Sequence, residues 1–263
     1  MTYKHTFKKS FGQNFLKSDK VASLMVTKLD ITPNENIIEI GSGEGALTSV
    51  LLKTGNKIFS VEIDNDLIKV LEEKFGKNTN FNLIHMNILD LDIDSDGSKK
   101  YSVIGSLPYN ISKKIINKFV LAKNKPRNMV ILIQKEVGID YCCKAPKASF
   151  LSNYIQIFAD AFYIKTISKS LFYPKPKVDG AIILFKLKEK MPQDYLRIIS
   201  TLKSGFLHPR KILASNLQSL NIRKNKIESF LNELNYSRNV RAEQIKFEDW
   251  LKINSFIRSE NVI

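Results

Sequence analysis

The segment 106–109, Ser-Leu-Pro-Tyr, follows the apolar run Tyr101–Gly105 and is predicted to end a buried strand. The Ser106 hydroxyl and the Leu107 carbonyl are two hydrogen-bond acceptors, and Pro108 restricts the backbone so that this carbonyl faces outward. Two acceptors on the hydrogens of an exocyclic amine draw its nitrogen toward tetrahedral geometry, which frees the lone pair to attack a methyl group. Tyr109, expected to be exposed, offers a face on which an extruded base stacks, a contact of roughly 1–3 kcal/mol.

A glycine-rich turn could hold the methyl donor. Gly41, Gly43 and Gly45 follow the apolar run Ile37–Ile40, and Glu62 ends the next apolar run, where its carboxylate could bind ribose hydroxyls. This layout serves both dinucleotides and S-adenosylmethionine. The spacing is G-x-G-x-G rather than the dinucleotide G-x-G-x-x-G, which favours S-adenosylmethionine over NAD. A tight turn without a ligand is the structural alternative, and the position of Glu62 argues against it.

Alternating strands and helices must position these residues. Apolar runs alternate with helical patterns such as the one opened by the capping candidate Asp64, and Ser18 is a second capping candidate. The predicted strands are Ile37–Ile40, Ile58–Val61, Phe81–Ile84, Ser102–Ile104 and Met129–Ile133. This order predicts an α/β fold with a Rossmann-like, doubly wound parallel sheet, followed by a late, antiparallel pair at 161–167 and 180–187.

The pattern changes to helices only after Lys190. The predicted helices are 195–207, 209–220, 226–234 and 247–257. We therefore expect a Rossmann-like domain at residues 1–188 and a small helical, RNA-binding domain at 189–263.

The charge of the chain favours a polyanionic partner. The 263 residues include 41 Lys and Arg and 26 Asp and Glu, a net charge of +15, and 111–127 contains basic residues without an acid. Nucleic acid is the commonest partner of such a field, although a lysine-rich proteome gives the same composition. Arg210 and Lys211 are expected to open a helix after Pro209, where their charges oppose the helix dipole and suggest a ligand. The candidate phosphate contacts are Lys8, Lys9, Lys113, Lys114, Lys175, Lys177, Arg210 and Lys211.

Cysteine content and hydropathy indicate a cytoplasmic protein. Cys142 and Cys143 are adjacent, which is poor geometry for a disulfide and offers no metal-ligand spacing, so no metal is expected. The sequence has no apolar signal segment and no run of about 18 apolar residues, so neither secretion nor a membrane span is expected.

Eight motifs in order make the chain resemble the ribosomal RNA adenine N6,N6-dimethyltransferase family, most closely its bacterial small-subunit branch. They are FGQNFL (11–16), EIGSGEGALT (39–48), VEID (61–64), LPYNIS (107–112), QKEV (134–137), FYPKPKVDGA (172–181), HPRKILASNL (208–217) and RAEQIKFEDW (241–250). The resemblance implies that S-adenosylmethionine is the donor. It also implies a substrate of two adjacent adenosines in the 3′-terminal hairpin loop of 16S rRNA, within the small ribosomal subunit or its precursor, and a monomeric enzyme.

The resemblance also implies the site residues. The donor contacts are Gln13, Asn14, Leu16, Gly41, Gly43, Glu62, Ile63, Asn87, Ile88 and Ser106. The catalytic and target-base contacts are Ser106, Leu107, Pro108, Tyr109 and Phe172. Phe172 is the candidate for the second face of the base, and its alternative role is an aromatic side chain in the core.

Two departures from the family pattern leave alternatives open. Ser106 stands where the family has Asn, and Asn87 replaces the usual Asp that accepts from the donor's adenine amine. These departures favour a catalytically weak ribosome-assembly factor as one alternative. A second alternative is a 23S rRNA adenine N6-methyltransferase of the macrolide-resistance type, against which the motifs at 208–217 and 241–250 argue.

Overall fold

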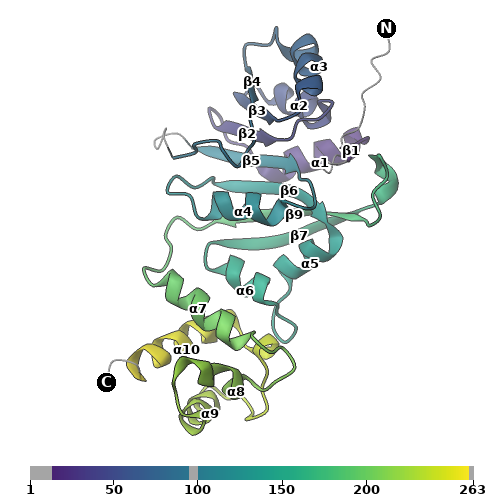
Figure 1. The fold of residues 1–263 in the computed structure, drawn as a ribbon. Helices are drawn as coiled ribbons and strands as arrows, with labels where there is room; N and C mark the ends of the chain where they lie inside the picture. Colours follow the sequence, from purple (N-terminus) through teal and green to yellow (C-terminus); the bar gives the residue numbers. More distant parts are fainter. Residues whose placement is uncertain (1–13, 95–99, 261–263) are drawn as a thin grey trace. The chain divides into compact units, whose positions relative to one another are not determined.

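A computed structural model describes residues 14–94 and 100–260 (Figure 1). In chain order the elements are β1 (Phe15–Leu16), α1 (Asp19–Leu29), β2 (Asn36–Ile40), α2 (Ala46–Leu51), η2 (Leu52–Thr54), β3 (Ile58–Glu62), α3 (Asn65–Phe75), β4 (Phe81–His85), β5 (Tyr101–Ser106), α4 (Ser112–Val120), β6 (Asn128–Gln134), α5 (Lys135–Cys142), α6 (Phe150–Gln156), β7 (Ala159–Ile167), η3 (Lys169–Leu171), β8 (Phe172–Tyr173), β9 (Gly180–Leu187), α7 (Tyr195–Gly205), α8 (Leu213–Leu217), η4 (Gln218–Leu220), α9 (Lys224–Glu233), η5 (Ala242–Gln244) and α10 (Phe247–Glu260). None of the helices in these two ranges is long and apolar enough to cross a membrane.

A seven-stranded sheet forms the centre of the first part of the chain. Its strand order is β4-β3-β2-β5-β6-β9-β7, and the pairs from β4 to β6 are parallel, whereas β9 runs antiparallel to β6. The predicted α/β, Rossmann-like sheet is therefore confirmed. The strand order reverses between β2 and β5, which is where open α/β sheets bind ligands at their carboxyl ends. The loops after β2 and β5 are those with the glycine turn and the 106–109 motif.

Local sequence signals start the helices beside this site. Ser18 caps α1, with its side chain accepting from Val21 N–H at 3.4 Å, and Asp64 caps α3 by accepting from Asp66 N–H at 3.1 Å. Both capping predictions are confirmed. Apolar side chains of α1, α2 and the central strands then pack into one buried core, which holds the strand ends rigidly under the ligand loops.

A second, two-stranded sheet pairs distant parts of the sequence. β1 and β8 are antiparallel, with Phe15 opposite Tyr173 and Leu16 opposite Phe172. The backbone N–H of Lys17 continues this pairing by donating to the carbonyl of Leu171 at 2.8 Å. The pairing joins the ends of two motifs, residues 15–16 and 172–173, and was not predicted from the sequence.

The chain divides into two compact units, and the division differs from the predicted domains 1–188 and 189–263. The first unit comprises Met1–Gly138 and Phe162–Glu189, and the second comprises Ile139–Ala161 and Lys190–Ile263. The segment that contains α6 therefore groups with the C-terminal helices. Its Phe150 ring packs edge-on against Phe206, with the ring centroids 6.3 Å apart, and Phe158 packs edge-on against Tyr195 at 5.8 Å, so aromatic contacts contribute to the grouping.

The second unit is organised around Trp250, which is fully buried and stacks on Phe206. The predicted helix 209–220 was wrong at its start, because α8 begins only at Leu213. Arg210 and Lys211 lie in the preceding turn, exposed to solvent. They therefore precede the first turn of α8, which is only five residues long, and the helix-dipole argument for a ligand beside them is weakened.

Candidate active site

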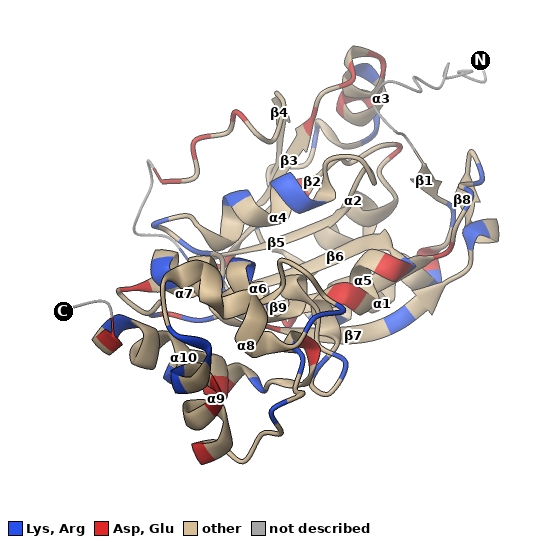
Figure 2. Ribbon diagram, turned by 60° about the horizontal axis from the view of Figure 1, so that its bottom comes forward, with Lys and Arg blue, Asp and Glu red and all other residues tan. Residues whose placement is uncertain are grey.

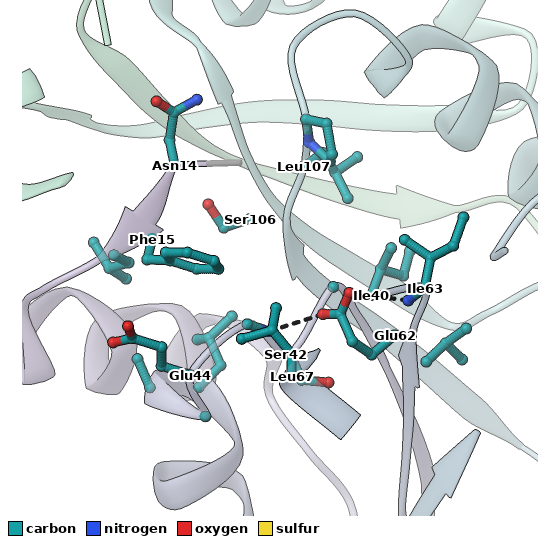
Figure 3. A pocket seen from close by; sticks show the side chains of 18 of the residues that line it. Asn14, Phe15, Ile40, Ser42, Glu44, Glu62, Ile63, Leu67, Ser106 and Leu107 are labelled. Carbon is teal, nitrogen blue, oxygen red and sulfur yellow. Dashed lines mark hydrogen bonds between the residues drawn. The ribbon is translucent and has the colours of Figure 1, made fainter. Parts of the chain in front are cut away.

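A cavity of about 690 Å³ opens at the carboxyl ends of β2, β3 and β5 within the first unit (Figure 3). Its walls come from the glycine turn, the ends of β3 and β4, the 106–111 segment and residues 14–19 before α1. Every predicted donor or base contact in the described ranges lines this cavity. Gln13 lies outside those ranges.

Each glycine of the turn has a separate steric role. Gly41, Gly43 and Gly45 adopt positive φ angles of +68°, +58° and +88°, which side chains of L-residues rarely tolerate. A Cβ built on Gly43 would meet the ring of Phe15, and one on Gly45 would meet the ring of Phe75. Among the described residues nothing lies within 4 Å of a Cβ built on Gly41. Gly41 therefore presents bare backbone to a space that a ligand can fill.

Glu62 lies at the end of β3, only 5% exposed. One of its carboxylate oxygens accepts from Gly43 N–H at 3.0 Å, and the other accepts from the N–H groups of Ile63 and Asp64 at 2.9 and 3.1 Å. Burial raises the pKa of Glu62 above its usual value, although these hydrogen bonds oppose the rise. Three backbone donors fix the carboxylate at the cavity wall, where its remaining lone pairs can accept from vicinal hydroxyls.

Glu39 lies beneath the turn and was missed by the sequence analysis. Its fully buried carboxyl accepts from Thr48 Oγ1 at 2.8 and 3.0 Å and from Ser60 Oγ at 2.8 Å, while Ser60 also bonds to Ser42 in the turn. Burial, with a smaller contribution from the charge of Glu62, raises the pKa of Glu39 to about 7. An acidic residue within the apolar run Ile37–Ile40 was the available signal. This network ties β2, β3 and α2 to the glycine turn.

The cavity wall beyond Glu62 is apolar and suits a flat ring. Ile63 and Met86 are 40% and 38% exposed there, an unusual exposure for large apolar side chains beside a cavity. Ile88 also lines the cavity and is buried. Asn87 lies on the same wall, and its side-chain oxygen accepts from Leu89 N–H at 3.0 Å. One lone pair of that oxygen is left for a ligand amine. Met86 was not predicted.

The 106–109 segment lines the same cavity as Glu62, and Figure 3 shows its Ser106 and Leu107. Leu107 N–H donates to the carbonyl of Leu132 at 3.0 Å, which extends the β5–β6 pairing and fixes the turn at Pro108. Ile40 pairs with Gly105, so Gly41 and Ser106 follow adjacent strand ends, and both line the cavity, as the sequence predicted.

The two aromatic candidates for stacking on the base, Tyr109 and Phe172, are more buried than free stacking surfaces would be. Tyr109 is half-buried rather than exposed, and its hydroxyl is buried without a hydrogen-bond partner in the part of the chain that the structure describes. Burial, and then the charge of Asp179, raise the pKa of Tyr109. Phe172 is 5% exposed and belongs to the core, yet it also lines the cavity. Packing therefore restricts both rings, and only a part of each ring faces the cavity.

The basic candidates fall into distinct groups. Lys113 and Lys114 are exposed on α4, which carries basic and no acidic colour in Figure 2. Lys175 and Lys177 are exposed between β8 and β9. Lys8 and Lys9 lie outside the described ranges, and Arg210 and Lys211 are in the second unit.

Not every basic side chain of the 111–127 segment is free to contact a polyanion. Lys118 donates to the carbonyl of Leu89 at 2.9 Å, and the guanidinium of Arg127 donates to buried Glu35 at 3.0 and 3.2 Å. These two side chains stabilise the fold. Fewer positive charges of the segment are therefore available to a polyanion than its net charge suggests.

The chain matches known proteins over nearly its whole length. A family model described as ribosomal RNA adenine dimethylase matches residues 4–259. A protein of Fusobacterium nucleatum named ribosomal RNA small subunit methyltransferase A is 34% identical over 261 residues, 96% of this chain and 97% of that protein. A protein of the same name from Mycoplasmopsis pulmonis is 37% identical over 246 residues, 92% of this chain and 96% of that protein.

Solved structures have the same fold at lower identity. A dimethyladenosine transferase from Plasmodium falciparum has a TM-score of 0.78 at 20% identity, covering 94% of this chain and 98% of that one. The 23S rRNA methyltransferase ErmE has a TM-score of 0.79 at 20% identity, covering 93% and 99%. These likenesses include the helical C-terminal region as well as the sheet.

Proposed function

The chain belongs to the ribosomal RNA adenine dimethylase family, and from this membership we propose that it dimethylates the N6 amines of two adjacent adenosines in the 3′-terminal hairpin loop of 16S rRNA. The donor is S-adenosylmethionine, and the reaction takes place in the cytoplasm during assembly of the small ribosomal subunit. One observation carries the proposal. A single cavity joins a bare glycine backbone, a fixed carboxylate and the 106–109 acceptor segment.

The described residues fit the donor. Gly41 leaves space for close backbone approach, Glu62 can accept from the ribose hydroxyls, and the apolar wall of Ile63 and Met86 fits an adenine ring. Asn87 can accept from the adenine amine, and Asn14 and Leu16 bound the other side. When bound, the donor supplies an electrophilic methyl group carried on a sulfonium.

The residues of the 106–109 segment prepare the amine. The Ser106 hydroxyl and the Leu107 carbonyl accept from the two N6 hydrogens, which localises the nitrogen lone pair. Tyr109 offers its half-buried ring to one face of the extruded base, and Phe172, buried in the cavity wall, is the candidate for the other face, while Pro108 keeps the acceptors in place. Because these residues are fixed by the strand end and by the core, catalysis rests on positioning and not on a strong base.

Phosphate contacts supply most of the affinity for RNA. Lys113, Lys114, Lys175 and Lys177 are exposed in the same unit as the cavity. Lys8, Lys9, Arg210 and Lys211 remain proposed contacts. Basic side chains bind any phosphate backbone, so the shape of the hairpin and the splayed loop give specificity. We propose that one copy of the chain acts alone.

The relatives do not favour the 23S alternative. Proteins at 34% and 37% identity carry a small-subunit name, whereas ErmE is 20% identical and its likeness concerns the fold. A catalytically weak assembly factor is not favoured either, because the curated relatives at 34% and 37% identity are named methyltransferases.

A transfer assay tests the proposal. The purified protein would be incubated with methyl-labelled S-adenosylmethionine and small subunits from a strain that lacks this modification, with 50S subunits as the control. Mass spectrometry of the 16S 3′ hairpin should then show dimethyladenosine at both positions. Binding of the subunit without transfer, or label only in 23S rRNA, would contradict the proposal.

A further inference from the structure

Two opposite charges face each other on the wall of the cavity. The ammonium of Lys17, between β1 and α1, forms an ion pair with the carboxylate of Glu44 in the glycine turn. Both residues line the cavity, and their side chains are 45% and 35% exposed. Such a partly exposed ion pair typically adds only about 0–1 kcal/mol to the free energy of unfolding. Its contribution to stability alone therefore does not explain why the two charges face each other at the cavity.

The backbone holds both members in place. Lys17 N–H donates to the carbonyl of Leu171 in the continuation of the β1–β8 pairing, and Ser18 caps α1 directly after it. On the other side, Lys74 of α3 also lines the cavity and donates to the backbone carbonyl of Glu44 at 2.9 Å. This bond uses the backbone carbonyl of Glu44 and not its carboxylate, which pairs with Lys17.

The pair lies at the end of the cavity away from the apolar wall. Figure 3 shows Glu44 and Ile63 on opposite sides, with Ser106 and Glu62 between them. A ligand with its ring at Ile63 and its ribose at Glu62 therefore extends past Ser106 toward Glu44 and Lys17. In S-adenosylmethionine the part beyond the sulfonium is an amino-acid end, a zwitterion with one ammonium and one carboxylate.

We propose that Lys17 and Glu44 form the binding site for this zwitterionic end. Lys17 pairs with the donor carboxylate and Glu44 with the donor ammonium, so the internal ion pair is exchanged for two pairs with the ligand. After the exchange, Lys17 and Glu44 each still have an oppositely charged partner, so neither charge is left unpaired at the cavity wall. The inference rests on the proposed donor and assigns two residues beyond the contacts carried over from the family motifs.

Three ligands that differ only at this end test the inference by equilibrium binding. S-adenosylhomocysteine carries the whole zwitterion, decarboxylated S-adenosylhomocysteine keeps only the ammonium, and 5′-methylthioadenosine has neither group. Dissociation constants would be measured by calorimetry for the wild type, Lys17→Ala, Lys17→Arg and Glu44→Gln. The control is Lys20→Ala, which removes an exposed lysine of α1 that does not line the cavity.

The ligands should separate the roles of the two residues. Lys17→Ala should weaken S-adenosylhomocysteine binding about tenfold, and Lys17→Arg should restore most of it. Neither variant should change the affinity for the two ligands without a carboxylate by more than about twofold. Glu44→Gln should weaken both ligands that carry an ammonium several-fold and leave 5′-methylthioadenosine unchanged. Lys20→Ala should behave as wild type.

The opposite results are equally clear. Equal loss for all three ligands in Lys17→Ala would show that the pair only holds the segment 14–19 in place, and would overturn the assignment. No loss for S-adenosylhomocysteine would overturn it as well. A wild-type protein that binds none of the ligands would instead contradict the proposed donor itself.

Discussion

The ring of Phe15 lies directly against Gly43, so that a Cβ added to Gly43 would stand 2.7 Å from Cδ1 of the ring. The two-residue strand β1 thus forms part of the cavity wall, because its aromatic side chain covers the glycine turn. The backbone of Gly43 in turn donates to Glu62. Gly43 therefore joins Phe15, which packs against it, to Glu62, which accepts its N–H.

Gly43→Ala is expected to weaken S-adenosylhomocysteine binding more than tenfold. The substitution forces a side chain onto a positive φ of +58° and into Phe15. Gly55→Ala is the matched control, because Gly55 has a φ of +78° and open space around a built Cβ among the described residues. The control should lose about 1 kcal/mol of stability and bind normally. Calorimetry and thermal unfolding of both variants measure the two effects.

Ser106→Ala should slow single-turnover methyl transfer about 10- to 100-fold, because it removes one of two acceptors for the amine. Affinity for the small subunit, measured by filter binding, should stay within about twofold of wild type. Ser106→Asn restores the residue type of the family and should keep or raise the rate. Unchanged turnover in the alanine variant would refute the role assigned to this hydroxyl.

Asn87→Asp should tighten donor binding about three- to tenfold. A carboxylate gives a charge-assisted hydrogen bond to the adenine amine, roughly twice as strong as one from an amide oxygen. It can still accept from Leu89 N–H, as Asn87 does at 3.0 Å. Calorimetry with 5′-methylthioadenosine suits the test, because that ligand reports the adenine contact without the amino-acid end. Weaker binding would place the adenine elsewhere.

Glu39 should make stability fall as the pH rises from about 5 to 8. Its pKa is raised from 4.5 to about 7 in the folded protein, so the proton binds the native state more tightly. The stabilisation is complete below pH 4.5 and is lost as the pH rises through 7. Glu39→Gln removes this dependence, so wild type should lose about 3 kcal/mol relative to the variant over that range. Parallel curves from denaturant titrations would contradict this.

Lys113→Gln combined with Lys114→Gln should weaken RNA binding and lower its salt dependence. The slope of log K against log salt should fall by about 0.7 to 0.9 for each phosphate contact that is lost. Lys57→Gln is the control, since Lys57 is exposed at the amino end of β3, the end opposite the cavity. An unchanged slope in the double variant would exclude α4 from the RNA interface.

Short-range patterns made most of the site predictable. Glycines, capping residues and apolar runs act within a few residues, so the sequence placed the turn after β2 and the 106–109 segment at adjacent strand ends. The order of parallel strands then brought them together by topology alone. Glu39 was overlooked because a single acid in an apolar run does not reveal the hydroxyls that will surround it.

Long-range contacts were not predictable in the same way. The pairing of Leu16 with Phe172, the ion pair of Lys17 with Glu44 and the packing of Phe150 on Phe206 depend on residues far apart in the chain. The error in the predicted start of the helix at Pro209 has a local cause. Proline suits a first helical turn, but here the chain makes a further turn before Leu213, and Asn216 donates to the carbonyl of His208 at 3.1 Å, which holds that turn.

The β1–β8 ladder also bears on biosynthesis. Residues 15 and 16 leave the ribosome early, but their partners at 172 and 173 emerge only after most of the sheet has been made. Closing so large a loop is slow compared with forming neighbouring strands and helices. The wall that carries Phe15 and Leu16 is therefore expected to be completed late in folding, so a nascent chain should acquire its central strands well before it can hold a nucleoside.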